Sequence, residues 1–170
     1  MSALVRHPER GLTLTEVTIV TVLAAVVMTG IIVFYLNSQA TWIDGSAQAI
    51  TQREATLALR ELTTRSHNAA AAISTTSPST LTLQTYADRG DPHWTFWADP
   101  GDSLLYESYT DSLGLTHPMG ALITSRVAAF TVWNDADIVH VDSLRLLTPQ
   151  GTSVAVSGSA AMFNRGALAP

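Results

Sequence analysis

The chain has 170 residues and a formal net charge of −5, from 14 acidic side chains and nine arginines, with no lysine. It has no cysteine, which excludes disulfides, zinc–thiolate sites and cysteine nucleophiles. This length accommodates one membrane anchor and one domain of about 100 residues, and the acidic balance argues against a nucleic-acid partner.

An apolar run, Val17–Leu36, follows a short basic leader. About 20 apolar residues at a rise of 1.5 Å cover a hydrocarbon core about 30 Å thick, so this run predicts a membrane-spanning helix. One acid, Glu16, stands at its start, and the next charge is Asp44. A carboxylate at membrane depth is costly unless it is neutralised or meets a cation, so Glu16 is a candidate functional residue.

Two further patterns concern the orientation of this helix in the membrane and its packing against other helices. Arginines 6 and 10 precede the run, whereas the residues beyond Leu36 are acidic by five, so we expect the N-terminus in the cytoplasm and the rest on the opposite side of the membrane. Small or hydroxylated side chains also fall within about 120° of one another at 100° per residue. Such a stripe lets membrane helices approach closely. Its members are Thr15, Thr18, Thr21, Ala25 and Thr29.

Residues 10–17, Arg-Gly-Leu-Thr-Leu-Thr-Glu-Val, resemble the leader junction of type IV prepilins and type II secretion pseudopilins. The resemblance implies that a prepilin peptidase of the inner membrane cuts after Gly11 and methylates the new amino terminus on Leu12. It also implies that Glu16 forms an assembly salt bridge with the amine of a neighbouring subunit. The sequence departs from the family pattern in having Leu12 where Phe is usual and Thr15 where an apolar residue is usual.

Two other interpretations of this segment remain open. One is an ordinary signal anchor that keeps its leader. The other is a secretory signal peptide, because Ser38-Gln39-Ala40 resembles a small-x-small cleavage site. Against the second, the run exceeds the typical hydrophobic region of about 7–15 residues. An acid such as Glu16 is also rare between the basic end and the apolar run.

Beyond the membrane, residues 37–72 contain no proline and favour a continued helix. Apolar residues recur there at near-heptad spacing and need a partner surface, either the chain's own domain or a neighbour. They are Ile43, Ala47, Ile50, Leu57 and Leu62.

After a loop over residues 73–80, the apolar pattern alternates with a period of two, which predicts antiparallel β-structure. The expected strands are 81–86, 94–97, 104–109, 121–125, 128–133, 138–147 and 153–163, with a turn at Asp99-Pro100-Gly101-Asp102. The predicted fold class is α+β, a long N-terminal helix packed on an antiparallel sheet. The expected regions are a leader (1–11), a membrane half of the helix (12–36), a periplasmic half (37–72) and a β domain (73–170).

Within the family, the chain is similar to minor pseudopilins, nearest the J component of type II secretion or the PilW-like minor pilins. Residues 57–70 resemble the helical stretch before a small-residue exit in those proteins. Residues 153–165, which end in Met-Phe-Asn-Arg, resemble their closing strand. The resemblance implies other pilin or pseudopilin subunits as partners, with secreted protein as a further candidate.

Other candidate chemistry is sparse. The five histidines (7, 67, 93, 117 and 140) lack metal-ligand spacing. Asp99 with Asp102, and Asp88 with Asp91, offer oxygen ligands for calcium, although turn residues that bond their own backbone explain them more simply. The sequence contains no hydrolase or phosphate-loop motif, so we expect no enzyme and no required cofactor.

Three hypotheses follow from different classes. The first is a structural subunit that helps start or cap a periplasmic filament, for secretion, piliation or competence. The second is a binding role at the filament tip, toward secreted cargo or, less in keeping with the acidic domain, DNA. The third is a signal-anchored periplasmic enzyme, for which the sequence shows no catalytic constellation.

Mass spectrometry of the mature amino terminus separates the three interpretations of the leader. A methylated Leu12 is the expected result, because the junction places the cut after Gly11. An N-terminal Thr41 identifies a secretory signal peptide, and an intact leader identifies a plain anchor.

Overall fold

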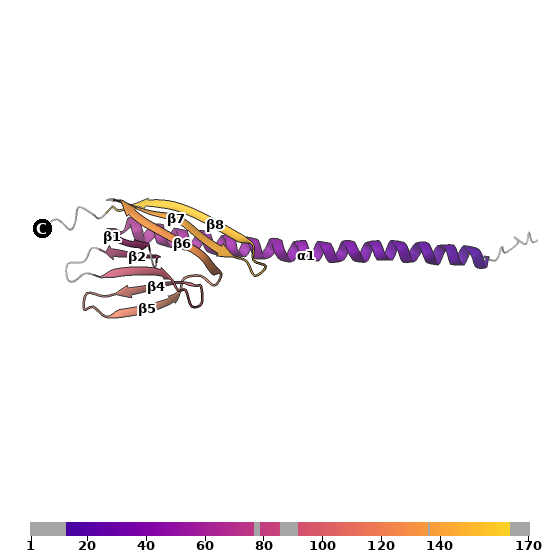
Figure 1. The fold of residues 1–170 in the computed structure, drawn as a ribbon, viewed down its shortest axis with the longest axis horizontal. Helices are drawn as coiled ribbons and strands as arrows, with labels where there is room; N and C mark the ends of the chain where they lie inside the picture. Colours follow the sequence, from indigo (N-terminus) through magenta and orange to yellow (C-terminus); the bar gives the residue numbers. More distant parts are fainter. Residues whose placement is uncertain (1–12, 77–78, 86–91, 136, 164–170) are drawn as a thin grey trace, which may run out of the picture. The chain divides into compact units, whose positions relative to one another are not determined.

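A computed structural model describes residues 13–76, 79–85, 92–135 and 137–163. It has one long helix, α1 (Leu14–His67), followed in the described residues by eight strands (Figure 1). The strands are β1 (Ala69–Thr76), β2 (Ser79–Thr85), β3 (His93–Ala98), β4 (Leu105–Thr110), β5 (Thr116–Ala121), β6 (Arg126–Asp135), β7 (Ile138–Leu147) and β8 (Ser153–Ala161). The chain divides after residue 43 into two compact units, which we describe separately.

The first unit consists of α1 from its start to residue 43. Its side chains are exposed throughout, including the large apolar ones, so nothing in this unit shields them from solvent. By length and composition, α1 is apolar enough near its N-terminus to cross a membrane.

The second unit places residues 44–67 of α1 against two antiparallel sheets (Figure 1). One sheet has the strand order β1-β2-β3-β4-β5 and the other β6-β7-β8. The α+β class predicted from the sequence is therefore confirmed, with two sheets in place of the expected one.

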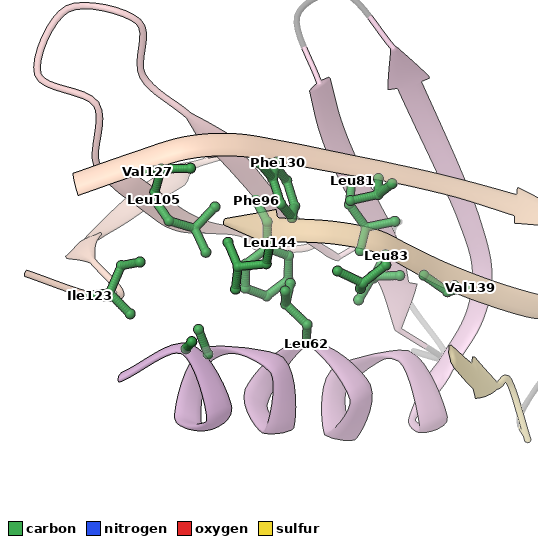
Figure 2. Packing of buried hydrophobic residues seen from close by; sticks show 14 of the residues in the cluster. Leu62, Leu81, Leu83, Phe96, Leu105, Ile123, Val127, Phe130, Val139 and Leu144 are labelled. Atoms are coloured by element: carbon green, nitrogen blue, oxygen red, sulfur yellow. The ribbon is translucent and has the colours of Figure 1, made fainter. Parts of the chain in front are cut away.

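The core lies between the helix and the inner faces of both sheets. Leu62 points from α1 toward Leu144 and Phe96 (Figure 2), and all three side chains are fully buried. Burying a side chain of this size stabilises the fold by about 1.5–3 kcal/mol. This unit therefore has a hydrophobic core of its own.

The helix packs on the domain through a stripe that the sequence did not indicate. The buried positions are Thr51, Ala55, Ala58, Leu62 and Ser66, which recur every three or four residues on one face. Of the predicted heptad positions, Leu62 is buried as expected, whereas Ile43, Ile50 and Leu57 are exposed. Small residues on the buried face let the helix approach the sheets closely: a Cβ added at Gly158 of β8 would lie 3.3 Å from the Leu59 side chain.

The helix ends at His67, before the expected limit at residue 72. Asn68 N–H donates to the carbonyls of Thr64 and Arg65, and the chain then enters β1 directly. Alanines 69–72 favour helix in isolation, but here they pair with β2, and Ala69 and Ala70 are buried. Tertiary pairing has overridden local propensity.

The strand predictions hold for β3, β4, β6, β7 and β8, and that for β2 holds with shifted ends. The predicted loop over residues 73–80 is wrong, because β1 extends through residue 76. The strand predicted at 121–125 is also wrong, because β5 covers Thr116–Ala121. Its Pro118 argues against a strand, but β5 is an edge strand, where a missing backbone N–H is tolerated.

Two polar contacts tie the elements of this unit together. Asn134 of β6 accepts hydrogen bonds from the Ser74 N–H (3.1 Å) and hydroxyl (2.7 Å) and donates to the Ala72 carbonyl (3.1 Å), which joins the two sheets. Glu54 of α1 accepts from the Thr124 hydroxyl (2.5 Å) and the Ser125 N–H (2.8 Å), which holds the loop before β6. Both contacts join segments more than 50 residues apart in the chain.

Glu54 makes the stability of this unit depend on pH. Burial raises the pKa of its carboxyl, but the hydrogen bonds from Thr124 and Ser125 outweigh burial and hold the pKa below its ordinary value. A lowered folded-state pKa contributes stability that is present above the unfolded-state pKa and is lost as the pH falls through the folded-state pKa. We expect Glu54→Gln to lower the free energy of unfolding at pH 7 by about 1–2 kcal/mol.

Urea unfolding of the detergent-solubilised chain, followed by tryptophan fluorescence, measures the loss of unfolding free energy in Glu54→Gln. The deficit should shrink below about pH 4, where the wild-type carboxylate also protonates. Asp142→Asn removes an equal charge from an exposed position on β7 and should have little effect. A Glu54→Gln deficit that is the same at pH 3 and pH 7 would contradict the charged role.

Candidate functional site

The first turn of α1 holds the best-defined candidate site. The Thr13 N–H and hydroxyl both donate to Glu16 Oε2 at 2.9 Å, and the Glu16 N–H lies 3.3 Å from Thr13 Oγ1. This reciprocal arrangement is a capping box, in which a threonine and a glutamate three residues later satisfy backbone groups at a helix start. Glu16 therefore has a partner within its own chain.

The sequence carries the signal of a capping box, Thr-x-x-Glu before an apolar run. Glu16 was interpreted from the sequence only as a costly acid at membrane depth. A cap of this kind is worth about 1 kcal/mol to the helix. It also turns the carboxylate toward the chain's N-terminal end.

The threonines of the predicted polar stripe satisfy their hydroxyls within the helix. Thr18 donates to the Leu14 carbonyl at 2.9 Å, and Thr29 donates to the Ala25 carbonyl at 2.8 Å. Thr21 does the same toward Val17 at 2.9 Å. Because no hydroxyl here needs a partner outside the helix, these threonines cost little in an apolar surrounding. Close packing against another helix stays a prediction.

Several predicted residues lie outside the described part of the chain. They are Gly11 and Leu12 at the predicted cleavage site, His7, the pair Asp88 and Asp91, and the terminal Asn164 and Arg165. Glu16 is thus the predicted junction residue whose side chain can be placed.

The aspartates proposed for calcium bond their own turn. Asp99 Oδ1 accepts from the Gly101 N–H at 2.7 Å. Asp102 accepts from the Leu104 N–H at 3.0 Å and from the Tyr106 hydroxyl at 2.5 Å. The Tyr106 hydrogen bond in particular lowers the pKa of the Asp102 carboxyl. Within the described residues, no three histidine, aspartate or glutamate side chains gather as a metal site would require.

The aromatic residues of β3 divide between the two faces of its sheet, because successive side chains of a strand point to opposite faces. Phe96 is fully buried and Trp94 packs against the core, whereas Trp97 stacks on Tyr106 on the other face, with ring centres 5.7 Å apart. The Arg65 guanidinium lies 3.6 Å from the centre of the Trp94 ring and bonds Glu61 at 2.7 Å. Glu61 and Arg65 have the i,i+4 spacing that brings opposite charges together on a helix.

Glu107 on β4 completes this group, and the sequence did not single it out. Its Oε2 atom is buried and has no hydrogen-bond partner among the described residues. Burial raises the pKa of the Glu107 carboxyl, while Arg65 lowers it and Glu61 raises it.

A groove of about 450 Å³ on the same helix face as Glu61 is lined by Leu57, Ala58, Arg60, Glu61, Thr64 and Leu122.

Comparison with known proteins found no matching family model, no matching curated protein and no matching solved structure. Any functional conclusion must therefore come from the residues and the geometry of this chain.

Glu107 should reduce stability at neutral pH, in contrast to Glu54. Because its folded-state pKa is raised, the stability that comes from its neutral form is present below the unfolded-state pKa and is lost as the pH rises through the folded-state pKa. We expect Glu107→Gln to raise the free energy of unfolding at pH 7 by roughly 0.5 kcal/mol, since solvent screens part of the burial cost.

Urea titrations between pH 4 and pH 8 test this expectation, and the gain should disappear at the acidic end. Asp142→Asn is the control, because it removes a carboxylate from an exposed position of β7 and should produce no gain. If Glu107→Gln destabilises the fold at pH 7, the carboxylate has a stabilising partner that this geometry does not identify.

Proposed function

We propose that this chain is a minor pilin-like subunit: a prepilin peptidase processes it after Gly11, and it helps to initiate or cap a periplasmic pseudopilus for type II protein secretion. Its role is structural, without a catalytic centre. The single observation that carries the proposal is Glu16, the one acid at the start of the uncharged apolar run 17–36, held in the first turn of α1.

The exposed apolar side chains of the first unit need an apolar environment. In the proposed function this environment changes from the membrane to the filament. The apolar side chains from Leu14 to Leu36 stand free of any contact that would bury them. Each one left in water costs about 1.5–3 kcal/mol relative to burial, so lipid must surround them first. In a filament, neighbouring helices would replace the lipid.

The capping geometry supports the proposed partner of Glu16. Cleavage after Gly11 would create an amine on Leu12, one residue before the Thr13 N–H that Glu16 already accepts at 2.9 Å. A carboxylate aimed at this end of the helix can exchange its own cap for the amine of a neighbour shifted along the axis. A charge-assisted bond to an amine is stronger than a bond to a neutral N–H.

The second unit offers surface for contacts with other subunits. Ile50 and Leu57, seven residues apart on α1, keep 60% and 51% of their side chains exposed because the domain packs on a different stripe. Seven residues are two helical turns, so both lie on one face. We assign this face to neighbouring pilin or pseudopilin helices. The basic leader favours a cytoplasmic N-terminus and a periplasmic domain.

A minor pilin of a type IV pilus or a competence system is the alternative, since it would use the same helix and the same acid. The exported part carries an excess of five acids over arginines, which favours protein neighbours or secreted cargo over DNA. A signal-anchored periplasmic protein without assembly is the less favoured reading.

Substitutions at Glu16 test the proposal, because charge and capping can be separated. Glutamine at this position keeps the capping box and removes the charge, whereas alanine removes both. We expect Glu16→Gln and Glu16→Ala to be cut and methylated as the wild type is. Both variants should fail to assemble with the other subunits, as measured by crosslinking, and should fail to support secretion or piliation in cells.

Thr13→Ser is the matched control, because it keeps the capping hydroxyl and the acid and should assemble normally. If Glu16→Gln assembles while Glu16→Ala does not, the residue acts as a helix cap and the salt bridge is wrong. If both variants assemble, Glu16 has no part in assembly.

A further inference from the structure

Two amphipathic aromatic side chains follow one another just where the apolar run ends. Tyr35 is 59% exposed and Trp42 is 78% exposed. They are seven residues apart on α1, which is two turns, so both rings lie on one face of the helix.

Polar groups accompany these rings. The Gln39 side chain donates to the Tyr35 hydroxyl at 2.6 Å. A shallow groove of about 380 Å³ on this face is lined by Tyr35, Ser38, Gln39, Trp42 and Ile43. Within the described residues, no hydrogen bond or ring contact is found for the Trp42 indole. This face therefore combines large apolar rings with unshielded polar groups.

Neither water nor hydrocarbon suits such a face alone. Water leaves the rings exposed, and hydrocarbon leaves the indole N–H without an acceptor. The boundary between acyl chains and headgroups satisfies both demands, which is why tryptophan and tyrosine gather there in membrane proteins. The chemistry of this face fits a lipid–water interface.

The position of the rings along the helix agrees with the dimensions of a bilayer. From Glu16 to Tyr35 the helix rises about 28 Å at 1.5 Å per residue, close to the hydrocarbon thickness of about 30 Å. From Glu16 to Trp42 it rises about 39 Å, which is about 37 Å along the membrane normal at an average helix tilt of about 20° and matches the roughly 35–37 Å of the hydrocarbon plus one headgroup layer. The first charge after Glu16, Asp44, follows Trp42 by two residues.

We propose that Tyr35 and Trp42 anchor α1 at the membrane interface opposite the leader, with phospholipid as the occupant of their face. The inference rests on the membrane-inserted state of the proposed function and deepens it. With the rings held at one interface, the length of the helix places Glu16 at the other edge of the hydrocarbon. The carboxylate then lies near water and headgroups and avoids the centre of the bilayer.

Quenching by brominated lipids tests this depth. The full chain is placed in vesicles of phosphatidylcholine and phosphatidylglycerol that carry bromines either near the glycerol end or near the methyl end of the acyl chains. We expect the shallow bromines to quench a part of the tryptophan emission and the deep bromines to quench clearly less. Trp42→Phe should lose the lipid-quenchable part.

Trp133→Phe is the matched control, since Trp133 is an exposed tryptophan of β6 and its removal should leave lipid quenching unchanged. Equal quenching of the wild type and Trp42→Phe, or stronger quenching by the deep bromines, overturns the proposal. So does a loss of Trp42 quenching as the protein-to-lipid ratio rises, because a second copy would then cover the ring.

The assay needs neither the peptidase nor a filament, so its failure is distinct from failure of the proposed function. Quenching of Trp42 together with an intact leader keeps the anchor and refutes the pilin-like subunit. A methylated Leu12 without quenching of Trp42 refutes the anchor and keeps the pilin-like subunit.

Discussion

The whole structure depends on how one helix is covered along its length. From Thr51 to Ser66, a stripe of small and apolar residues on α1 is buried beneath two sheets. From Leu14 to Leu36, the same helix has no cover within its unit. This stripe packs into the one core that it shares with the inner faces of both sheets. The exposed stretch needs a surrounding that is not water.

Three carboxylates show how surroundings decide what an acid does in this chain. Glu16 caps its own helix, Glu54 accepts two hydrogen bonds from a loop, and Glu107 has a buried oxygen without a partner. The pKa of Glu54 is lowered and that of Glu107 is raised, because hydrogen bonds favour the charged form and burial disfavours it. The same residue type thus stabilises the fold at one place and opposes it at another.

In the proposed function, both ends of the exposed part of α1 have a physical role. A capped acid at one end is satisfied without a partner and can still accept a stronger one. Aromatic rings at the other end suit an interface. Threonine hydroxyls between them bond their own helix, so the stretch can lie in lipid or against other helices without an unsatisfied group. These features suit a segment that exchanges one apolar surrounding for another.

Sequence alone determined the apolar run, the lone acid, the α+β class and most of the strands, because these follow from composition and from periods of 3.6 and two residues. It did not determine which stripe of the helix packs: the exposed Ile50 and Leu57 are more apolar than the buried Thr51, Ala55 and Ala58. Nor did it place β1 or β5, where pairing with a neighbouring strand outweighs alanine propensity and a proline. Glu54 and Asn134 gained their roles only from hydrogen-bond partners far along the chain, and Glu107 gained its role from burial in the folded domain. Local patterns report what a segment can form by itself, whereas close approach and long-range hydrogen bonds exist only once the chain has folded.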